Sequence, residues 1–139
     1  MKEIVLDTNV LISGLLSAQN PPGRIVDALR NGAIRLIADD RILSEYRTVL
    51  RRPYFERYIK AIEREWMIEF LSRDSRIVVC DQVFDDLPDP KDACFLEVAF
   101  NAGLPLVTGN VKHFPLEKNR GVKVLTPAEF VERSLVRRK

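Results

Sequence analysis

Short apolar runs that alternate with helical segments restrict the fold of this chain more than any other feature. Five such runs are expected to form strands, and they cover residues 4–6, 34–38, 77–80, 104–108 and 122–125. Runs this short and this apolar are typical of strands that are covered on both faces. The alternation therefore predicts an α/β fold in which a parallel sheet lies between two layers of helices.

Residues that commonly start or stop helices bound the segments between the strands. We expect a helix from near Val10, a loop over 19–23, and helices over 24–31, 41–52, 55–73, 91–102 and from Pro127 onward. Gly32, Pro53 and Gly103 end three of these helices. The acidic pair Asp39-Asp40 can cap the helix that follows it.

The length suits one domain and is too short for two ordinary ones, so we expect one domain over residues 1–139. No apolar run approaches the roughly 20 residues needed to cross a bilayer, which excludes a membrane span. The start of the chain lacks an export signal, so the cytoplasm is the expected location. In that setting Cys80 and Cys94 are interpreted as small core residues rather than a disulfide or a zinc pair.

Charge is nearly balanced but unevenly distributed. Lys and Arg number 22 and Asp and Glu number 20, which gives a net charge of +2. Basic residues gather between Arg41 and Arg64, and acidic residues gather between Asp81 and Asp92. This separation suits a polyanion held near a cation. On charge alone, however, solvated helix faces explain it better.

Polar residues follow the first and fourth strands, where ligands bind in parallel-sheet folds. Asp7-Thr8-Asn9 comes directly after the first strand, and Thr108-Gly109-Asn110 follows the fourth. Helix capping and a plain strand-to-helix turn explain these residues as well as chemistry does. His113, the only histidine, is interpreted as a surface or capping residue.

Asp92 gives a sharper signal because of its position on a predicted helix. A helical wheel over residues 91–102 places Asp92 on the apolar face and Glu97 and Asn101 on the opposite, solvent-facing side. A lone buried carboxylate costs several kcal/mol unless it is paired or bound to a metal. Asp89 can cap this helix in an arrangement that also uses Asp92, but we favour a functional role for Asp92.

Glu45 lies at the border of the apolar face of its own predicted helix. Pairing with Arg41 or Arg52 explains it by itself. The helix over residues 55–73 is expected to have an apolar face that could also serve a homodimer. Its members are Ile59, Ile62, Trp66 and Phe70.

These positions combine if the first and fourth strands are neighbours. Asp7, Asp92 and Asn110 then meet at one edge of the sheet, and Glu45 can lean in from its helix. Two carboxylates about 4 Å apart repel by ~4 kcal/mol at an effective dielectric near 20. A hard cation such as Mg²⁺ or Mn²⁺ relieves that repulsion and can activate water for attack at phosphorus.

At these residues the sequence resembles the PIN-domain nucleases, most closely the bacterial VapC-type toxins. The likeness runs from Met1 to about Phe130. It rests on residues 7–11, 43–46 and 89–96, and on Thr108-Gly109-Asn110 ahead of His113-Phe114. The resemblance implies a three-layer α/β/α sandwich with strand order 3-2-1-4-5. It also implies a ribonuclease that depends on Mg²⁺ or Mn²⁺, with a small antitoxin protein as partner.

By position, Asp7, Glu45 and Asp92 match the three acids of the family and are the expected metal ligands. Asn110 stands where many relatives have a fourth Asp, which weakens any second metal site. The resemblance further assigns supporting roles to four residues that would orient water and carboxylates or add charge. They are Thr8, Asn9, Asp89 and Thr108.

The sequence therefore predicts a metal-dependent endoribonuclease, the toxin of a toxin–antitoxin pair, with Asp7, Glu45, Asp92 and Asn110 as catalytic residues. Basic residues of the central helical region are the expected contacts to RNA phosphates. They are Arg41, Arg47, Arg51, Arg52 and Arg57. The alternative is a PIN-like module that binds RNA or protein with little or no cleavage. Phosphatase and receiver-domain folds fit poorly. A haloacid-dehalogenase-type phosphatase needs Asp-x-Asp after its first strand, where this chain has Asp7-Thr8-Asn9. A receiver domain needs a Lys after its fifth strand, where Thr126 and Pro127 follow instead.

Overall fold

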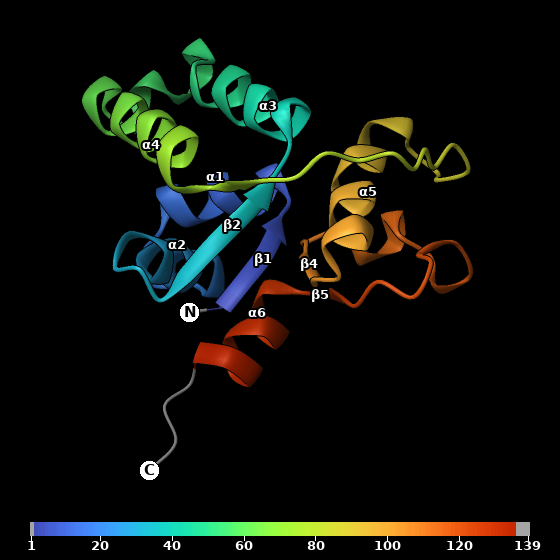
Figure 1. Ribbon diagram of the computed structural model, residues 1–139. Coiled ribbons are helices and arrows are strands. Elements are labelled where there is room, and N and C mark those ends of the chain that lie inside the picture. The colour runs from blue at the N-terminus through green and yellow to red at the C-terminus, as the bar shows by residue number, and fades with distance from the viewer. Residues whose placement is uncertain (1, 136–139) are drawn as a thin grey trace.

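The computed structural model describes residues 2–135 and contains a five-stranded parallel sheet (Figure 1). The strands are β1 (Lys2–Leu6), β2 (Ile34–Ala38), β3 (Arg76–Ile77), β4 (Leu106–Val107) and β5 (Val124–Leu125). Their order is β3-β2-β1-β4-β5, and each neighbouring pair is parallel. Glu3 lies opposite Arg35 on one side of β1, and Leu6 lies opposite Val107 on the other. The predicted strand order is confirmed. Met1 and residues 136–139 of the expected domain lie outside the described residues.

Helices cover the sheet and complete the expected three-layer sandwich. They are α1 (Thr8–Leu16), α2 (Pro21–Arg30), α3 (Asp40–Leu50), α4 (Ala61–Asp74), α5 (Ala93–Ala102) and α6 (Pro127–Phe130), with a π-helical turn over Val131–Leu135. Helices α1, α2 and α6 pack on one another, whereas α5 packs across β1, β2 and β4. Helices α3 and α4 pair with each other beyond the arrowhead ends of β1 and β2 (Figure 1).

The core forms where the strands are buried on both faces. Ile4, Val5 and Leu6 of β1 are at most 1% exposed, as a central parallel strand requires. Burial of each such side chain stabilises the fold by about 1.5–3 kcal/mol. The backbone N–H of Asp7 then donates to the carbonyl of Val107 at 3.0 Å, so the pairing of β1 with β4 extends to the first acid.

Several predicted boundaries shift, each for a local reason. Helix α2 begins at Pro21, inside the expected loop, because proline is compatible with a first helical turn and Asn20 caps it, accepting from the Gly23 N–H at 2.8 Å. The strand expected over residues 77–80 is only Arg76–Ile77, because β3 pairs with just the end of β2. A 3₁₀ turn over Pro90–Asp92 precedes α5.

The apolar face predicted for residues 55–73 is wrong in part. Ile59 and Phe70 are buried, but Ile62 is 77% exposed and Trp66 is 47% exposed. Arg64 takes the inner face instead, because its guanidinium donates to the carbonyls of Ile59 at 3.1 Å and of Leu50 at 3.0 Å.

The predicted helix over residues 55–73 is also divided in two. A 3₁₀ turn over Pro53–Arg57 comes first, and α4 starts only at Ala61. Pro53 occupies the first position of the turn, and Phe55 is its buried residue. The backbone between α3 and α4 therefore bends instead of continuing as one helix.

The wheel for α5 is also wrong at two positions. Glu97, expected to face solvent, is 3% exposed, and Phe100, which the wheel places toward the apolar side, is 41% exposed. Gly103 ends α5 as predicted, with φ +68°. Within the described residues, no helix combines the length and apolar character that crossing a membrane needs.

Candidate active site

A hollow of about 220 Å³ lies at the carboxyl ends of β1 and β4 and collects most of the predicted site residues. Seven residues that were predicted as catalytic or supporting line this pocket: Asp7, Thr8, Asn9, Glu45, Asp89, Asp92 and Asn110. Arg52, a predicted phosphate contact, also lines it, and so do Val49, Lys91, Phe95 and His113. Residues from four separate stretches of sequence thus meet at one edge of the sheet, as the parallel topology requires.

Asp7 is the most firmly held acid of this pocket. It is 6% exposed and caps α1, with its carboxylate accepting from the Asn9 N–H at 3.4 Å. The hydroxyl of Thr108, which is fully buried, donates to Asp7 Oδ2 at 2.7 Å. Both interpretations of Asp7 are therefore compatible: the residue caps a helix and presents a carboxylate to the pocket.

Thr108 supports the pocket although it is not one of the lining residues. Besides donating to Asp7, its hydroxyl oxygen accepts from the backbone N–H of Asn110 at 3.0 Å. One side chain therefore sets the orientation of the Asp7 carboxylate and the path of the chain at Asn110. This is the kind of support that the sequence assigns to Thr108.

Glu45 reaches the pocket from α3 with the help of Thr8. The Thr8 hydroxyl donates to Glu45 Oε2. Tyr46, the next residue on α3, is buried and donates from its hydroxyl to the carbonyl of Leu6 at 2.5 Å. Burial raises the pKa of Tyr46, so this hydroxyl stays protonated as a donor. These two contacts thus join α3 to the start of α1 and to the end of β1.

Asp92 faces the pocket from the turn before α5, next to His113. His113 Nδ1 lies 2.9 Å from Asp92 Oδ2, an ion pair when the imidazole is protonated. Within residues 2–135 this buried oxygen has no hydrogen-bond partner. Burial raises the pKa of Asp92, the charge of His113 lowers it, and the charges of Asp7 and Asp89 raise it further.

His113 is the site residue that sequence reasoning missed. It was interpreted as a surface or capping group, but it lines the pocket and contacts Asp92. The 3₁₀ turn over Val111–His113 places it one turn beyond Asn110. The available signal was its position three residues after Asn110, in a segment that carries the family resemblance. Asp89 caps the Pro90–Asp92 turn, accepting from the Lys91 N–H at 3.0 Å.

The predicted phosphate contacts separate into two groups. Arg52 lines the pocket, whereas Arg47 and Arg57 lie outside it. Arg51 is bound by Glu65 through two hydrogen bonds of 2.9 and 2.8 Å. Arg52 is therefore the member of the set that the structure places against the acids.

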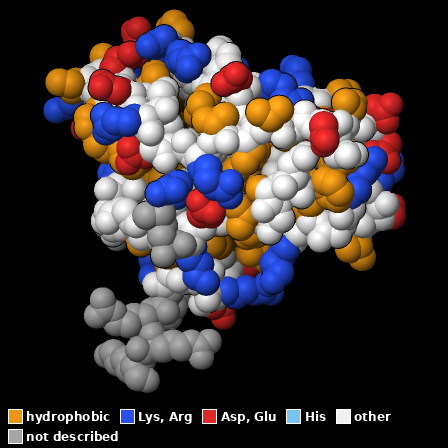
Figure 2. Space-filling view, in the orientation of Figure 1, with side chains coloured by type: hydrophobic (Ala, Val, Ile, Leu, Met, Phe, Trp, Pro, Cys, Tyr) orange, Lys and Arg blue, Asp and Glu red, His pale blue; other side chains and the backbone are white. Residues whose placement is uncertain are grey.

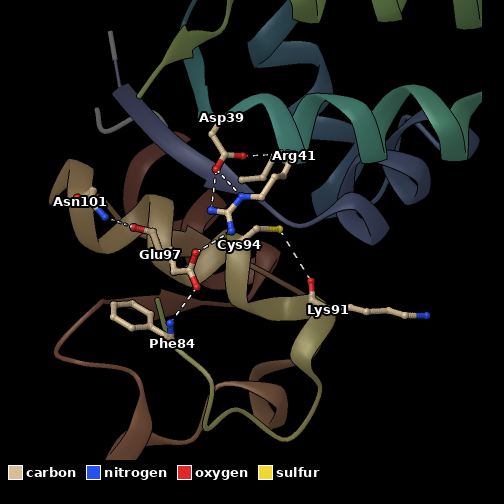
Figure 3. A network of polar contacts seen from close by, with 8 residues as sticks. Asp39, Arg41, Phe84, Lys91, Cys94, Glu97 and Asn101 are labelled. Atoms are coloured by element: carbon tan, nitrogen blue, oxygen red, sulfur yellow. Dashed lines mark hydrogen bonds and ion pairs between the residues drawn. The ribbon is translucent and has the colours of Figure 1, made fainter. Parts of the chain in front are cut away.

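Arg41 belongs to a polar network behind the pocket (Figure 3). Its guanidinium lies 2.7 Å from Asp39 Oδ2 and 2.8 Å from Glu97 Oε1. Glu97 in turn accepts from the backbone N–H of Phe84 at 2.9 Å. The network joins the start of α3, the middle of α5 and the segment that leads from β3 toward Asp92.

The two cysteines border this network and carry free thiols. Burial raises the pKa of Cys94 to about 12, and burial also raises the pKa of Cys80. Protonated thiols are poor nucleophiles and poor metal ligands. Both residues are half-buried, so they lie at the margin of the core.

The donor set suits a divalent cation, although the side chains do not form a ready cluster. Within the described residues, no three His, Cys, Asp or Glu side chains stand together as a metal-binding group. Four carboxylates and two carboxamides nevertheless border one hollow, and Asp92 Oδ2 is buried there without a hydrogen bond. Oxygen ligands of this kind fit Mg²⁺ or Mn²⁺ better than Zn²⁺.

A larger hollow of about 500 Å³ lies at the opposite edge of the sheet, beside Gly32 and Ile34. Its arginines are paired with acids, for example Arg76 with Glu3 at 3.1 Å. It also lies at the amino ends of the strands, where parallel sheets do not usually place their sites. We therefore assign the active site to the smaller, acidic pocket.

The fold and this acidic pocket define the class of protein to which the chain belongs. The family model described as PIN domain matches residues 3–112. The chain is a member of the PIN-domain family, whose domains are typically nucleases that use divalent metal ions and bind RNA. The resemblance seen in the sequence is confirmed at the level of the family.

A particular relative extends the likeness over nearly the whole chain. It is the uncharacterized protein MJ1680 of Methanocaldococcus jannaschii, 28% identical over 141 residues. The match covers 94% of this chain and 90% of the relative.

Proposed function

We propose that this protein is an endoribonuclease that hydrolyses RNA phosphodiester bonds with the help of Mg²⁺ or Mn²⁺. The observation that carries the proposal is the meeting of Asp7, Glu45, Asp92 and Asn110 around one pocket of a PIN fold. When bound, the cation would offset the negative charge of the phosphate and would activate a water molecule. Asp7, Asp92 and Glu45 are the residues that would hold it.

The chain's own residues supply the remaining parts of the mechanism. Thr108 and Thr8 hold the carboxylates of Asp7 and Glu45 in place, which preorganises the ligands before substrate arrives. Asn110 offers an amide donor to a phosphate oxygen, and a pocket carboxylate accepts the proton of the attacking water. Asn9 and Asp89, at the margin, orient water and add negative charge.

Basic groups at the rim bring the RNA backbone to these acids. Arg52 and Lys91 line the same pocket and face the carboxylates. Arg47 and Arg57 extend the basic surface, and we keep them as contacts to flanking phosphates. Arg41 and Arg51 contribute less in this proposal, because acidic partners hold their guanidinium groups.

Cleavage of labelled single-stranded RNA tests the proposal. Asp7→Asn and Asp92→Asn should each abolish cleavage in Mn²⁺, while circular dichroism shows an intact fold. Asp27→Asn, an exposed acid on α2, is the matched control and should cut like the wild type. Cleavage that persists in excess EDTA would contradict the proposal.

Binding of the cation gives a second measurement that does not depend on activity. At 100 times its dissociation constant, Mn²⁺ should stabilise the wild type by about 2.7 kcal/mol. Asp92→Asn should lose most of this gain. An equal gain in both proteins would place the cation elsewhere.

The biological role of this nuclease, its cellular location and its partners are further predictions. The VapC-type likeness favours a toxin that a small antitoxin blocks at this pocket, in the cytoplasm. A homodimer through α4 is a further expectation, for which the exposed Ile62 and Trp66 supply apolar surface. The competing function is an RNA- or protein-binding module with little cleavage, which Asn110 favours because it removes one acid. Such a module would bind RNA without giving Mn²⁺-dependent fragments.

A further inference from the structure

Two exposed tyrosines stand side by side on the turn that joins α3 to α4. Tyr54 is 66% exposed and Tyr58 is 56% exposed. Their ring centroids are 5.6 Å apart, at an interplanar angle of 47°. Phe55 between them is buried, and Tyr54 packs edge-on against it at 5.2 Å. The turn is thus anchored inward by Phe55 and presents two aromatic rings to solvent.

The other exposed side chains of the segment that carries the rings are mainly cations. The segment 52–60 contains Arg52, Arg57 and Lys60 against a single acid, Glu56. All three cations are exposed, and no ion pair reaches them within the described part of the chain. Figure 2 shows basic and hydrophobic side chains next to one another over the region where α3 ends and α4 begins. A partner for this surface must be anionic and must offer flat apolar groups.

The surface is continuous with the active-site pocket. Arg52 lines that pocket, and Tyr54 is only two residues farther along. Their Cα atoms are therefore at most about 7 Å apart. A strand whose phosphate lies at the acids would pass Arg52 and reach the tyrosines with its next nucleotides.

We propose that Tyr54 and Tyr58 form a stacking platform for unpaired bases of the RNA strand that enters the active site. The proposal rests on the proposed nuclease function and names the residues on which the bases of the substrate strand would stack. Aromatic rings stack on unpaired bases of any sequence, while neighbouring cations follow the backbone. Bases inside a duplex are not free to stack in this way, so paired RNA should gain nothing from the two rings.

The exposed side chains of α4 form a different kind of surface. Trp66 stacks on Phe70 with centroids 5.2 Å apart, and the nearby Arg51 is neutralised by Glu65. This region lacks the free cations of the segment 52–60 and therefore does not share the proposed role. It provides the matched control.

Fluorescence anisotropy with a labelled single-stranded RNA in EDTA tests the platform without cleavage. Tyr54→Ala and Tyr58→Ala should each weaken binding about tenfold, whereas the Phe variants keep the ring and should bind like the wild type. Trp66→Ala should leave binding unchanged. RNA with abasic positions should bind the wild type as weakly as ordinary RNA binds the double Ala variant.

The outcomes separate this proposal from the nuclease proposal. Equal binding by the wild type and both Ala variants, or no binding of single strands by the wild type, would overturn the platform. Cleavage in Mn²⁺ is measured separately, so failure of the platform can be told apart from failure of the proposed nuclease function. Loss of a dimer in the Ala variants, seen by sedimentation, would show instead that the rings contact a second copy. If the platform is right, the Ala variants raise KM for RNA and leave kcat close to the wild-type value.

Discussion

Glu97 allows a sharp test of how the two helices that carry the acids are held together. Its side chain is 4% exposed, and it binds two groups from distant parts of the chain. Oε2 accepts from the buried N–H of Phe84 at 2.9 Å, and Oε1 lies 2.8 Å from Arg41 Nη1. Arg41 itself is 51% exposed and keeps Asp39 as a second partner.

The cost of each substitution follows from what it leaves behind. Glu97→Ala strands the buried N–H of Phe84, which costs about 1–3 kcal/mol, and removes an ion pair worth up to ~1 kcal/mol. We therefore expect the free energy of unfolding to fall by about 1–4 kcal/mol. Glu97→Gln keeps an acceptor for Phe84, so its loss should be about 1 kcal/mol or less.

Arg41→Gln changes the other member of the same ion pair. It removes the more exposed partner but leaves the Glu97 carboxylate buried with only the N–H of Phe84. Breaking a fully buried pair costs roughly 3–5 kcal/mol. Because Arg41 is half-exposed, we expect a smaller loss of about 2–3 kcal/mol. That loss is still larger than the loss for Glu97→Gln.

Urea denaturation followed by circular dichroism measures these differences. Glu69→Gln, in an exposed ion pair on α4, is the control and should change stability by less than about 0.5 kcal/mol. The reasoning is refuted if Glu97→Gln costs as much as Glu97→Ala, or if Arg41→Gln is neutral.

Two further predictions concern the pocket itself. Thr108→Val keeps the shape of the side chain but removes the hydroxyl that donates to Asp7 and accepts from the Asn110 N–H. We therefore expect the free energy of unfolding to fall by about 1–3 kcal/mol and RNA cleavage to slow. Unchanged values in urea denaturation and in cleavage kinetics would contradict this role of Thr108. Burial raises the pKa of Asp92 in the folded state above its value in the unfolded chain, so folding favours the protonated carboxyl. The stability that Asp92 contributes is therefore present below the unfolded pKa and is lost as pH rises through the folded pKa. Asp92→Asn should therefore make the metal-free protein more stable than the wild type at neutral pH and not at acidic pH. Urea titrations at several pH values check this sign, and a variant that is less stable at neutral pH would show that the His113 pair outweighs burial.

Much of the active site could be predicted from the sequence because it depends on topology. Asp7 and Asn110 follow short apolar strands, and the carboxyl ends of parallel strands meet at one edge. Asp92 could be found because a carboxylate on an apolar helix face is unusual. The pairing of β1 with β4 then brings these residues together, as expected. The place of Glu45 came only from the resemblance to the family.

Several of the residues that were missed or misplaced are polar or charged groups whose position depends on a distant partner. Glu97 was expected to face solvent because a helical wheel only separates apolar from polar residues. It contains no information about Arg41 and Phe84, which pair with Glu97 from other parts of the chain. Arg64 is buried because the carbonyls at the end of α3 need a donor. His113 contacts Asp92 only because a 3₁₀ turn directs it back into the pocket.

The amino-acid order by itself determined the layers, the strand order implied by its family and the acids gathered at one sheet edge. Apolar periodicity and turn residues are local properties, and parallel crossovers leave few ways to arrange them. Tertiary structure alone decided which charges are buried, which arginines lack an acidic partner within the described residues, and that Tyr54 and Tyr58 face solvent. Those outcomes depend on contacts between residues far apart in the chain, whose free energies no local pattern contains.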